Sequence, residues 1–190
     1  LDLIQGRTAT NLGDIKRSNL LGDKAVNAVI FDDTRAYLAC GFGIVVVDLA
    51  RKEVRDTWRI GPNGSQVQVR DIAFHNDSIY AATSTGLFVA SRNEPNLAAF
   101  TNWRLRTDMG GNVAEGPFDE LASFQGRLLL NYKSAQGTRD TLLILSPENT
   151  WQRFAPFFDR ANTSVDVSRD GQYVLVAHGI NLDVYGANLF

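Results

Sequence analysis

The sequence predicts an all-β protein, a fragment of a β-propeller with about four blades of four antiparallel strands. Three observations lead to this fold class. A pattern repeats along the chain every 43 to 49 residues, apolar runs of strand length alternate with short polar turns, and no stretch keeps the apolar stripe of an ordinary helix. Periods of about 40–50 residues with four short strands per unit are typical of propeller blades.

The repeat is clearest between residues 26–48 and residues 69–91. Aromatic residues and a glycine recur 43 residues apart, in the pairs Phe31 and Phe74, Tyr37 and Tyr80, and Gly43 and Gly86. A third copy places Leu121 and Leu129 at two of the marker positions, and a fourth is aligned on Val165, Tyr173 and Gly179. Asp170-Gly171 between two apolar runs is a hairpin signal, because a type I′ turn needs positive φ at both central residues.

The elements follow from the repeat in chain order. Leu1–Ile4 and Asn11–Asn19 are expected as the third and fourth strands of one blade, so the chain begins in mid-blade. The expected units are residues 1–19, then blades at 26–60, 69–106 and 118–156, and an incomplete blade at 164–190. An open propeller leaves an edge strand and a blade face uncovered. We therefore expect either that the N-terminal strands complete the last blade or that two copies associate as a homodimer.

Composition excludes several classes of protein. With 190 residues, 44% of them hydrophobic, the chain can bury a core and is too apolar to be disordered. A net charge of −2 without a Lys/Arg run argues against a nucleic-acid-binding surface. The longest aliphatic run, residues 44–47, is far shorter than the ~20 residues of a membrane span. One cysteine excludes an internal disulfide and a cysteine-built zinc site, and we expect no metal and no cofactor.

Three segments resemble a known family. The runs YLACGFGIVVVDL (37–49), IGPNGS (60–65) and IYAATSTGLF (79–88) are similar to the N-terminal β-propeller of the PorZ family, components of the type IX secretion system of Bacteroidetes. The likeness covers most of residues 13–110, and beyond that only the general propeller pattern remains. No sorting domain of the kind that family carries at its C-terminus is present in these 190 residues.

The resemblance implies a non-enzymatic interaction module of an exported protein, at the periplasm or outer-membrane surface. The family belongs to an attachment complex that receives cargo and links it to anionic lipopolysaccharide, so the implied partners are other secretion-system proteins and an anionic lipopolysaccharide or glycan. An alternative is a periplasmic ligand-sensing propeller of a hybrid two-component regulator, whose third strands also begin with Gly-Leu, here Gly86-Leu87.

Few residues suggest chemistry of their own. Cys40 is expected to be a small buried residue, and His75 and His178 ordinary surface or turn histidines, since neither an HxH nor an HxxH spacing is present. Asp71 and Glu120 occupy the same register of two first strands, which line the propeller channel. Paired carboxylates are the groups a glycosidase uses, but the equivalent residues elsewhere are Ala28 and Ser164. We expect these carboxylates to accept hydrogen bonds from an inter-blade loop instead.

Loops that join the second strand to the third, or one blade to the next, are where propellers bind. Such loops lie at 61–65, 108–115 and 133–139. Asn63 and Ser65 in the first loop, and the positive charges of Lys133 and Arg139 in the third, are the binding residues that the sequence suggests for an anionic glycan or a partner protein.

Overall fold

The computed structural model describes residues 1–13, 23–109, 115–135, 139–154 and 160–186, and the all-β prediction is confirmed. These residues contain seventeen β-strands and two single 3-10 turns, at Pro62–Gly64 and Phe100–Asn102. The first hairpin consists of β1 (Asp2–Gln5) and β2 (Thr8–Asn11). The next sheet consists of β3 (Val26–Asp32), β4 (Arg35–Cys40), β5 (Gly43–Asp48) and β6 (Glu53–Trp58).

Two further four-stranded sheets and one three-stranded sheet follow. The second four-stranded sheet consists of β7 (Val69–His75), β8 (Ser78–Thr83), β9 (Gly86–Ser91) and β10 (Arg104–Arg106). The third consists of β11 (Phe118–Phe124), β12 (Arg127–Tyr132), β13 (Thr141–Leu145) and β14 (Trp151–Arg153). The three-stranded sheet consists of β15 (Asn162–Val167), β16 (Tyr173–His178) and β17 (Asn181–Gly186).

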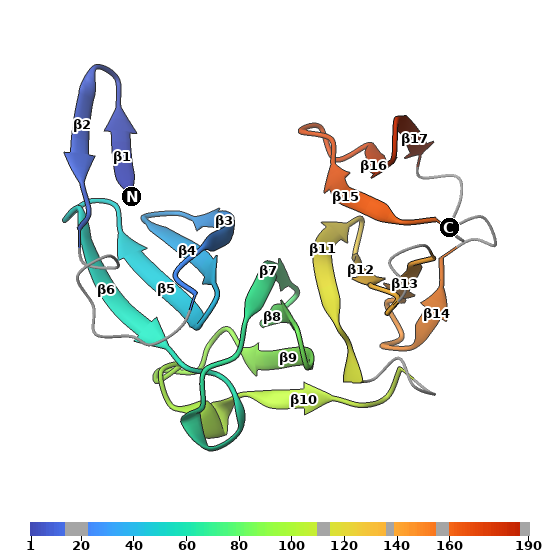
Figure 1. Ribbon diagram of the computed structural model, residues 1–190, viewed down its shortest axis with the longest axis horizontal. Helices are drawn as coiled ribbons and strands as arrows, with labels where there is room; N and C mark the ends of the chain where they lie inside the picture. The colour runs from blue at the N-terminus through green and yellow to red at the C-terminus, as the bar shows by residue number, and fades with distance from the viewer. Residues whose placement is uncertain (14–22, 110–114, 136–138, 155–159, 187–190) are drawn as a thin grey trace.

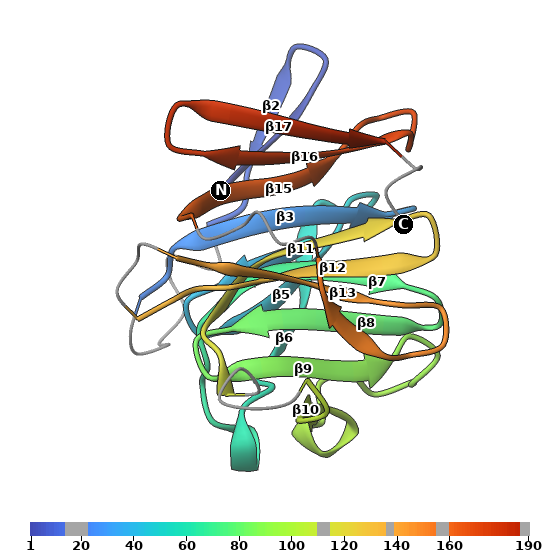
Figure 2. The same cartoon turned by 90° about the vertical axis from the view of Figure 1, so that its right-hand side faces the viewer.

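Each sheet is an antiparallel meander, and the sheets follow one another in an open arc (Figure 1). The first strand of each larger sheet, β3, β7, β11 or β15, lies on the inner side of the arc and contacts the first strand of the next sheet. The β1–β2 hairpin projects at one end of the arc in both views (Figure 1 and Figure 2). This arrangement of radial sheets around a centre is the architecture of a propeller.

Tight turns set the spacing of the repeat. In the first three sheets the inner hairpin closes over two residues, as in the pairing of Asp32 with Arg35. The first residue of each turn has positive φ, with values of 48° at Asp33, 50° at Asn76 and 47° at Gln125. Aspartate and asparagine tolerate this conformation, which the primed hairpin turns require, and in the third sheet Gln125 adopts it before Gly126.

Every inner strand carries a β-bulge at the same place. The pairing register shifts between Val26 and Ala28 in β3, and at the equivalent points of β7, β11 and β15. Each bulge inserts one extra residue near the start of the strand. The extra residues are Asn27, Arg70, Asp119 and Thr163.

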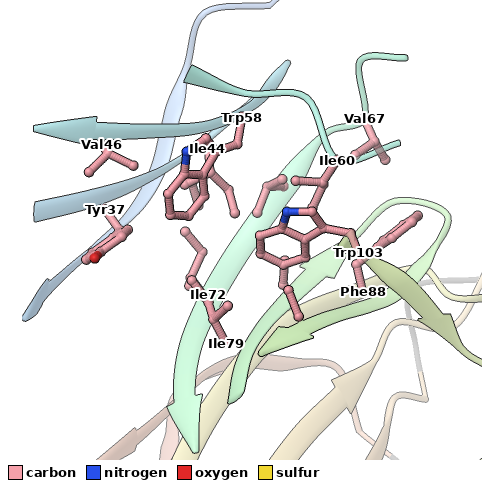
Figure 3. Packing of buried hydrophobic residues seen from close by; sticks show 14 residues of the cluster. Tyr37, Ile44, Val46, Trp58, Ile60, Val67, Ile72, Ile79, Phe88 and Trp103 are labelled. Atoms are coloured by element: carbon pink, nitrogen blue, oxygen red, sulfur yellow. The ribbon is translucent and has the colours of Figure 1, made fainter. Parts of the chain in front are cut away.

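The core lies between the sheets. One cluster joins the first and second four-stranded sheets, where Trp58 and Trp103 pack with ring centroids 6.1 Å apart (Figure 3). Aliphatic side chains such as Ile44 and Ile72 fill the rest of this layer. Similar clusters lie between the second and third sheets and between the third sheet and β15–β17. Because side chains alternate across a strand, each sheet contributes to the layer on both of its sides.

Two strand positions differ from the prediction. The second N-terminal strand is Thr8–Asn11 rather than Asn11–Asn19, because Gly6, with φ of 61°, turns the chain directly after Gln5; residues 14–19 of the expected strand lie outside the described residues. In the fourth unit the residue equivalent to Tyr37 is Leu175, not Tyr173, since it is the third residue of its strand.

The cause of the second difference is the loop between β15 and β16. Its flanking residues Ser168 and Tyr173 enclose four residues, whereas the other inner hairpins enclose two. The two added residues displace the rest of the unit by two positions. Asn181, rather than Gly179, therefore begins the third strand where Gly43 begins β5.

Both ends of the arc expose apolar side chains. At the β3 end Phe31 is 66% exposed, and at the β17 end Leu182 is 57% exposed. None of the described residues forms a helix that is long and apolar enough to cross a membrane.

Candidate binding surfaces

The carboxylates of the inner strands join neighbouring sheets. Asp71 on β7 accepts hydrogen bonds from the backbone N–H of Ile72, at 2.8 Å, and of Leu121 on β11, at 2.7 Å. Glu120 on β11 accepts in turn from the N–H of Val165 on β15, at 3.4 Å. The two carboxylates share a register, as expected, and both act between blades. Their partners are the next inner strands rather than the expected inter-blade loop.

Burial sets the protonation of this pair. Burial raises the pKa of Asp71 to about 6, although the N–H groups of Leu121 and Ile72 oppose the rise. Burial, and then the nearby charge of Asp71, raise the pKa of Glu120 to about 7. Asp71, which accepts two short hydrogen bonds, is the better site for the negative charge, so the proton stays on Glu120 near pH 6.5. Both groups thus form part of the joint between blades.

Lys133 lies inside an ion-pair network. Its Nζ is 3.0 Å from Asp140 Oδ2 and 3.3 Å from Asp119 Oδ2, and it donates to the carbonyl oxygen of Asn162 at 2.7 Å. Asn131 donates to both carboxylates. We call these five residues the Asp140 network. The charge of Lys133 is directed at two carboxylates of its own chain, whereas the sequence suggested that it would be available to an anionic ligand.

The other suggested binding residues are exposed. Asn63 and Ser65 lie on the loop between β6 and β7, where Ser65 both donates to Pro62 and accepts from Gly61. Arg139 is exposed, and its N–H donates to Ser134 Oγ at 3.2 Å. Because β6 and β12 run in the same sense within their meanders, both loops lie at the same end of the sheets. They belong to different sheets, and they share no hydrogen bond among the described residues. Residues 110–114 of the loop at 108–115 lie outside the described residues.

The histidines are buried, which corrects the expectation of surface or turn residues. His75 contacts Ser123 Oγ at 3.1 Å, and His178 Nε2 lies 2.8 Å from Asp183 Oδ2. Burial lowers the pKa of His75. Within the described ranges, no group of three or more His, Cys, Asp or Glu side chains is placed to hold a metal ion. Cys40 is 0% exposed, as predicted, and burial raises its pKa to about 11.

A pocket that the sequence did not indicate lies at the opposite end of the sheets. It has a volume of about 270 Å³ and is lined by the β3–β4 hairpin, by β6 and by the chain that follows β9. Three arginines, Arg35, Arg55 and Arg92, contribute to its wall. No spacing rule connects these residues, because they come from three different strands or loops.

Radial four-stranded meanders with an inner ladder of inter-blade contacts define the chain as a β-propeller protein. Comparison with known families then identifies which one. The sequence profile of the family described as TSS9, PorZ, N-terminal beta-propeller domain matches residues 1–104, and the chain belongs to this family. No curated protein matches the sequence.

Solved structures share the fold. PorZ, a surface component of the type IX secretion system of Porphyromonas gingivalis, superposes with a TM-score of 0.73 and 17% identity, over 96% of this chain and 22% of that one. The extracellular domain of a putative hybrid two-component system of B. thetaiotaomicron gives 0.58 and 13%, over 87% and 21%. The Pan2 WD40 domain of Neurospora crassa gives 0.57 and 11%, over 85% and 46%. The chain therefore spans about a fifth of the length of the first two proteins.

Proposed function

We propose that this propeller is a non-enzymatic interaction module of an exported protein in the type IX secretion attachment complex. In this proposal it lies in the periplasm or at the outer-membrane surface, contacts other secretion-system proteins, and supports cargo secretion and anchoring to anionic lipopolysaccharide. The observation that carries the proposal is the family match over residues 1–104, and the superposition on the PorZ fold over 96% of the chain supports it. The family and the fold are non-enzymatic in kind.

The contact residues we propose are Asn63, Ser65 and Arg139, which are exposed at one end of the sheets. With a net charge of −2 the chain has no overall attraction for an anion, so an anionic glycan needs local donors. Lys133 keeps a role in this surface because it holds Asp140, whose Oδ1 accepts from the N–H of Ser134, on the segment that leads to Arg139.

A homodimer is the second part of the proposal. The exposed Phe31 at one end of the arc and Leu182 at the other form apolar surfaces that two copies can bury together. Light scattering on the purified chain tests this part, and a monomeric mass at high protein concentration contradicts it.

The experiment for the main proposal is deletion of the parent gene, followed by localisation of exported cargo. We expect cargo to be retained in the periplasm or released without its lipopolysaccharide anchor. Complementation with Arg139→Glu should restore secretion less well than complementation with Arg153→Glu, a matched reversal at an exposed arginine on an outer strand. Equal restoration by both variants would remove Arg139 from the contact surface.

The alternative is a ligand-sensing propeller, which the likeness to a two-component extracellular domain favours. The same deletion separates the two. Normal cargo export together with lost induction of a glycan-utilisation operon would support sensing and contradict the secretion role.

A further inference from the structure

The pocket at the far end of the sheets has the character of a ligand site. We call it the inter-sheet pocket, defined by Arg35, Arg55 and Arg92 around its wall and Tyr37, Trp58 and Phe74 beneath. It lies between the first and second four-stranded sheets, at the end opposite the loop that carries Asn63. Its floor is continuous with the packed layer of Figure 3, where Tyr37 and Trp58 are labelled. The ring of Tyr37 packs against those of Phe74 and Trp58, with centroids 5.1 Å and 5.7 Å apart, and these contacts make the floor rigid.

A second β-bulge shapes the wall. On the outer strand, Val46 pairs with Asp56 but Val47 pairs with Val54, so Arg55 is the extra residue. Neighbouring residues of a regular strand face opposite sides, yet Arg55 and Asp56 both line the pocket. Bulges are frequent beside binding sites, where they redirect a side chain. The bulge thus adds the Arg55 guanidinium to the part of the wall that β6 contributes beside Asp56.

Three charged side chains of the pocket already have partners within the chain. Asp32 pairs with Arg92 at 2.6 Å, and the Arg92 guanidinium lies 4.6 Å from the centre of the Phe74 ring. Asp56 accepts from the N–H of Thr57 at 2.7 Å and from Trp58 Nε1 at 3.0 Å. These contacts fix the positions of three pocket side chains without a ligand.

The guanidinium groups of two pocket arginines remain available to a ligand. In the described part of the chain neither Arg35 nor Arg55 has a side-chain hydrogen bond or ion pair, although both line the pocket. The pKa of Asp48 is lowered mainly by the N–H of Arg51, with a smaller contribution from the charge of Arg55. The fork of a guanidinium matches a carboxylate, which it binds with two parallel hydrogen bonds. A pair of available arginines beside a rigid floor is therefore suited to an oxyanion.

We propose that the inter-sheet pocket binds one sugar residue that carries a carboxylate, with that carboxylate held between Arg35 and Arg55. The volume of about 270 Å³ lies just below the usual range of about 300–1,000 Å³ for ligand pockets and suits a single ring. Glu94, Asn93 and Asn96 at the rim supply acceptors and donors for hydroxyl groups. Acidic side chains in the wall repel a doubly charged phosphate more strongly than a singly charged carboxylate. The inference rests on the proposed function only in taking a glycan as the ligand.

The inference is tested by titrating the purified chain with single sugars and measuring their binding from NMR chemical-shift changes. The probes are galacturonate and glucuronate, with galactose, inorganic phosphate and N-acetylaspartate amide as comparisons. We expect saturable binding of at least one uronate and weaker binding of the comparisons. Arg35→Gln and Arg55→Gln should each weaken uronate binding about tenfold, the effect of losing one charge-assisted pair. Arg59→Gln, at an exposed arginine just beyond the other end of β6, should bind like the parent protein.

Several results overturn the proposal. It is wrong if neither uronate binds, or if galactose binds as tightly as a uronate does. It is also wrong if the Arg35→Gln/Arg55→Gln double variant binds uronates with the affinity of the parent protein. Tighter binding of phosphate would replace the carboxylate by a phosphoryl group, and tighter binding of N-acetylaspartate amide would make the ligand a peptide. The cargo assay is independent of these titrations. If the chain binds uronates but deletion of the parent gene leaves cargo secretion normal, the proposed function is contradicted and the inference about the pocket stands.

Discussion

From the raised pKa values of Asp71 and Glu120 we predict that the protein loses stability as the pH rises from 5 to 8. The pKa of Glu120 is raised from 4.5 to about 7, first by burial and then by the charge of Asp71. Between these two values the folded protein holds a proton that the unfolded chain has released. The free energy of unfolding therefore falls with increasing pH, and the contribution of protonated Glu120 is lost as the pH passes through about 7.

The magnitude follows from the shift. Each unit of pKa corresponds to about 1.4 kcal/mol, which gives an upper value of about 3 kcal/mol for Glu120. Glu120 is only partly buried, so solvent screening reduces this to about 1–2 kcal/mol between pH 5 and pH 8. Glu120→Gln removes the titration and keeps an oxygen that can accept from the N–H of Val165.

Urea unfolding at pH 5 and pH 8 is the assay. We expect Glu120→Gln to match the parent protein at pH 5 and to exceed it by about 1–2 kcal/mol at pH 8. Glu115→Gln, at an exposed position three residues before β11, serves as the control and should change neither value. The reasoning is refuted if the parent protein and Glu120→Gln keep the same difference in stability at both pH values.

Three further predictions test other parts of the fold. Lys133→Met should destabilise the protein by about 3–5 kcal/mol in denaturant melts, because the fully buried carboxylate of Asp140 loses its cation, whereas exposed Arg139→Gln should cost little. Gly43→Ala should prevent normal pairing of β5 with β6, since its Cβ would lie 2.2 Å from the carbonyl oxygen of Trp58; circular dichroism should show lost β-structure, while Gly179→Ala, with open space around it, should fold. Cys40, fully buried with its pKa raised to about 11, should resist a thiol reagent in the native protein and react in urea; rapid native reaction would contradict the burial.

Most of the fold was predictable because short turns keep the repeat in phase. Two-residue turns place Tyr37, Tyr80 and Leu129 at the third position of their strands, where sequence spacing alone locates them. The spacing fails after β15 because the loop enclosed by Ser168 and Tyr173 is two residues longer. A displacement of two residues keeps each side chain on the same face, so the pattern of apolar residues gives no warning of it.

The binding surfaces were less predictable, because they depend on contacts between sheets. The sequence indicates that Lys133 is charged, but not that Asp119 on β11 and Asp140 at the far end of the same loop both lie within ion-pair distance of it, nor that it donates to Asn162 of the next sheet. His75 is buried and contacts Ser123 Oγ of the neighbouring sheet, a contact that its sequence position does not indicate. Arg55 lines the inter-sheet pocket only because of a bulge, and a bulge has no simple sequence signature.

The recurrent bulge on the inner strands has a consequence for how such repeats diversify. The inserted residue is outside the ladder of paired positions, so its side chain can be exchanged while the pairing of the sheet is retained. In four successive repeats this position holds an amide, a guanidinium, a carboxylate and a hydroxyl. The residues are Asn27, Arg70, Asp119 and Thr163. Duplication of a blade thus supplies one position per copy that lies outside the ladder, and successive blades can carry a different chemical group there, as Asn27, with its hydrogen bond to Val69, and Asp119, with its ion pair to Lys133, already do.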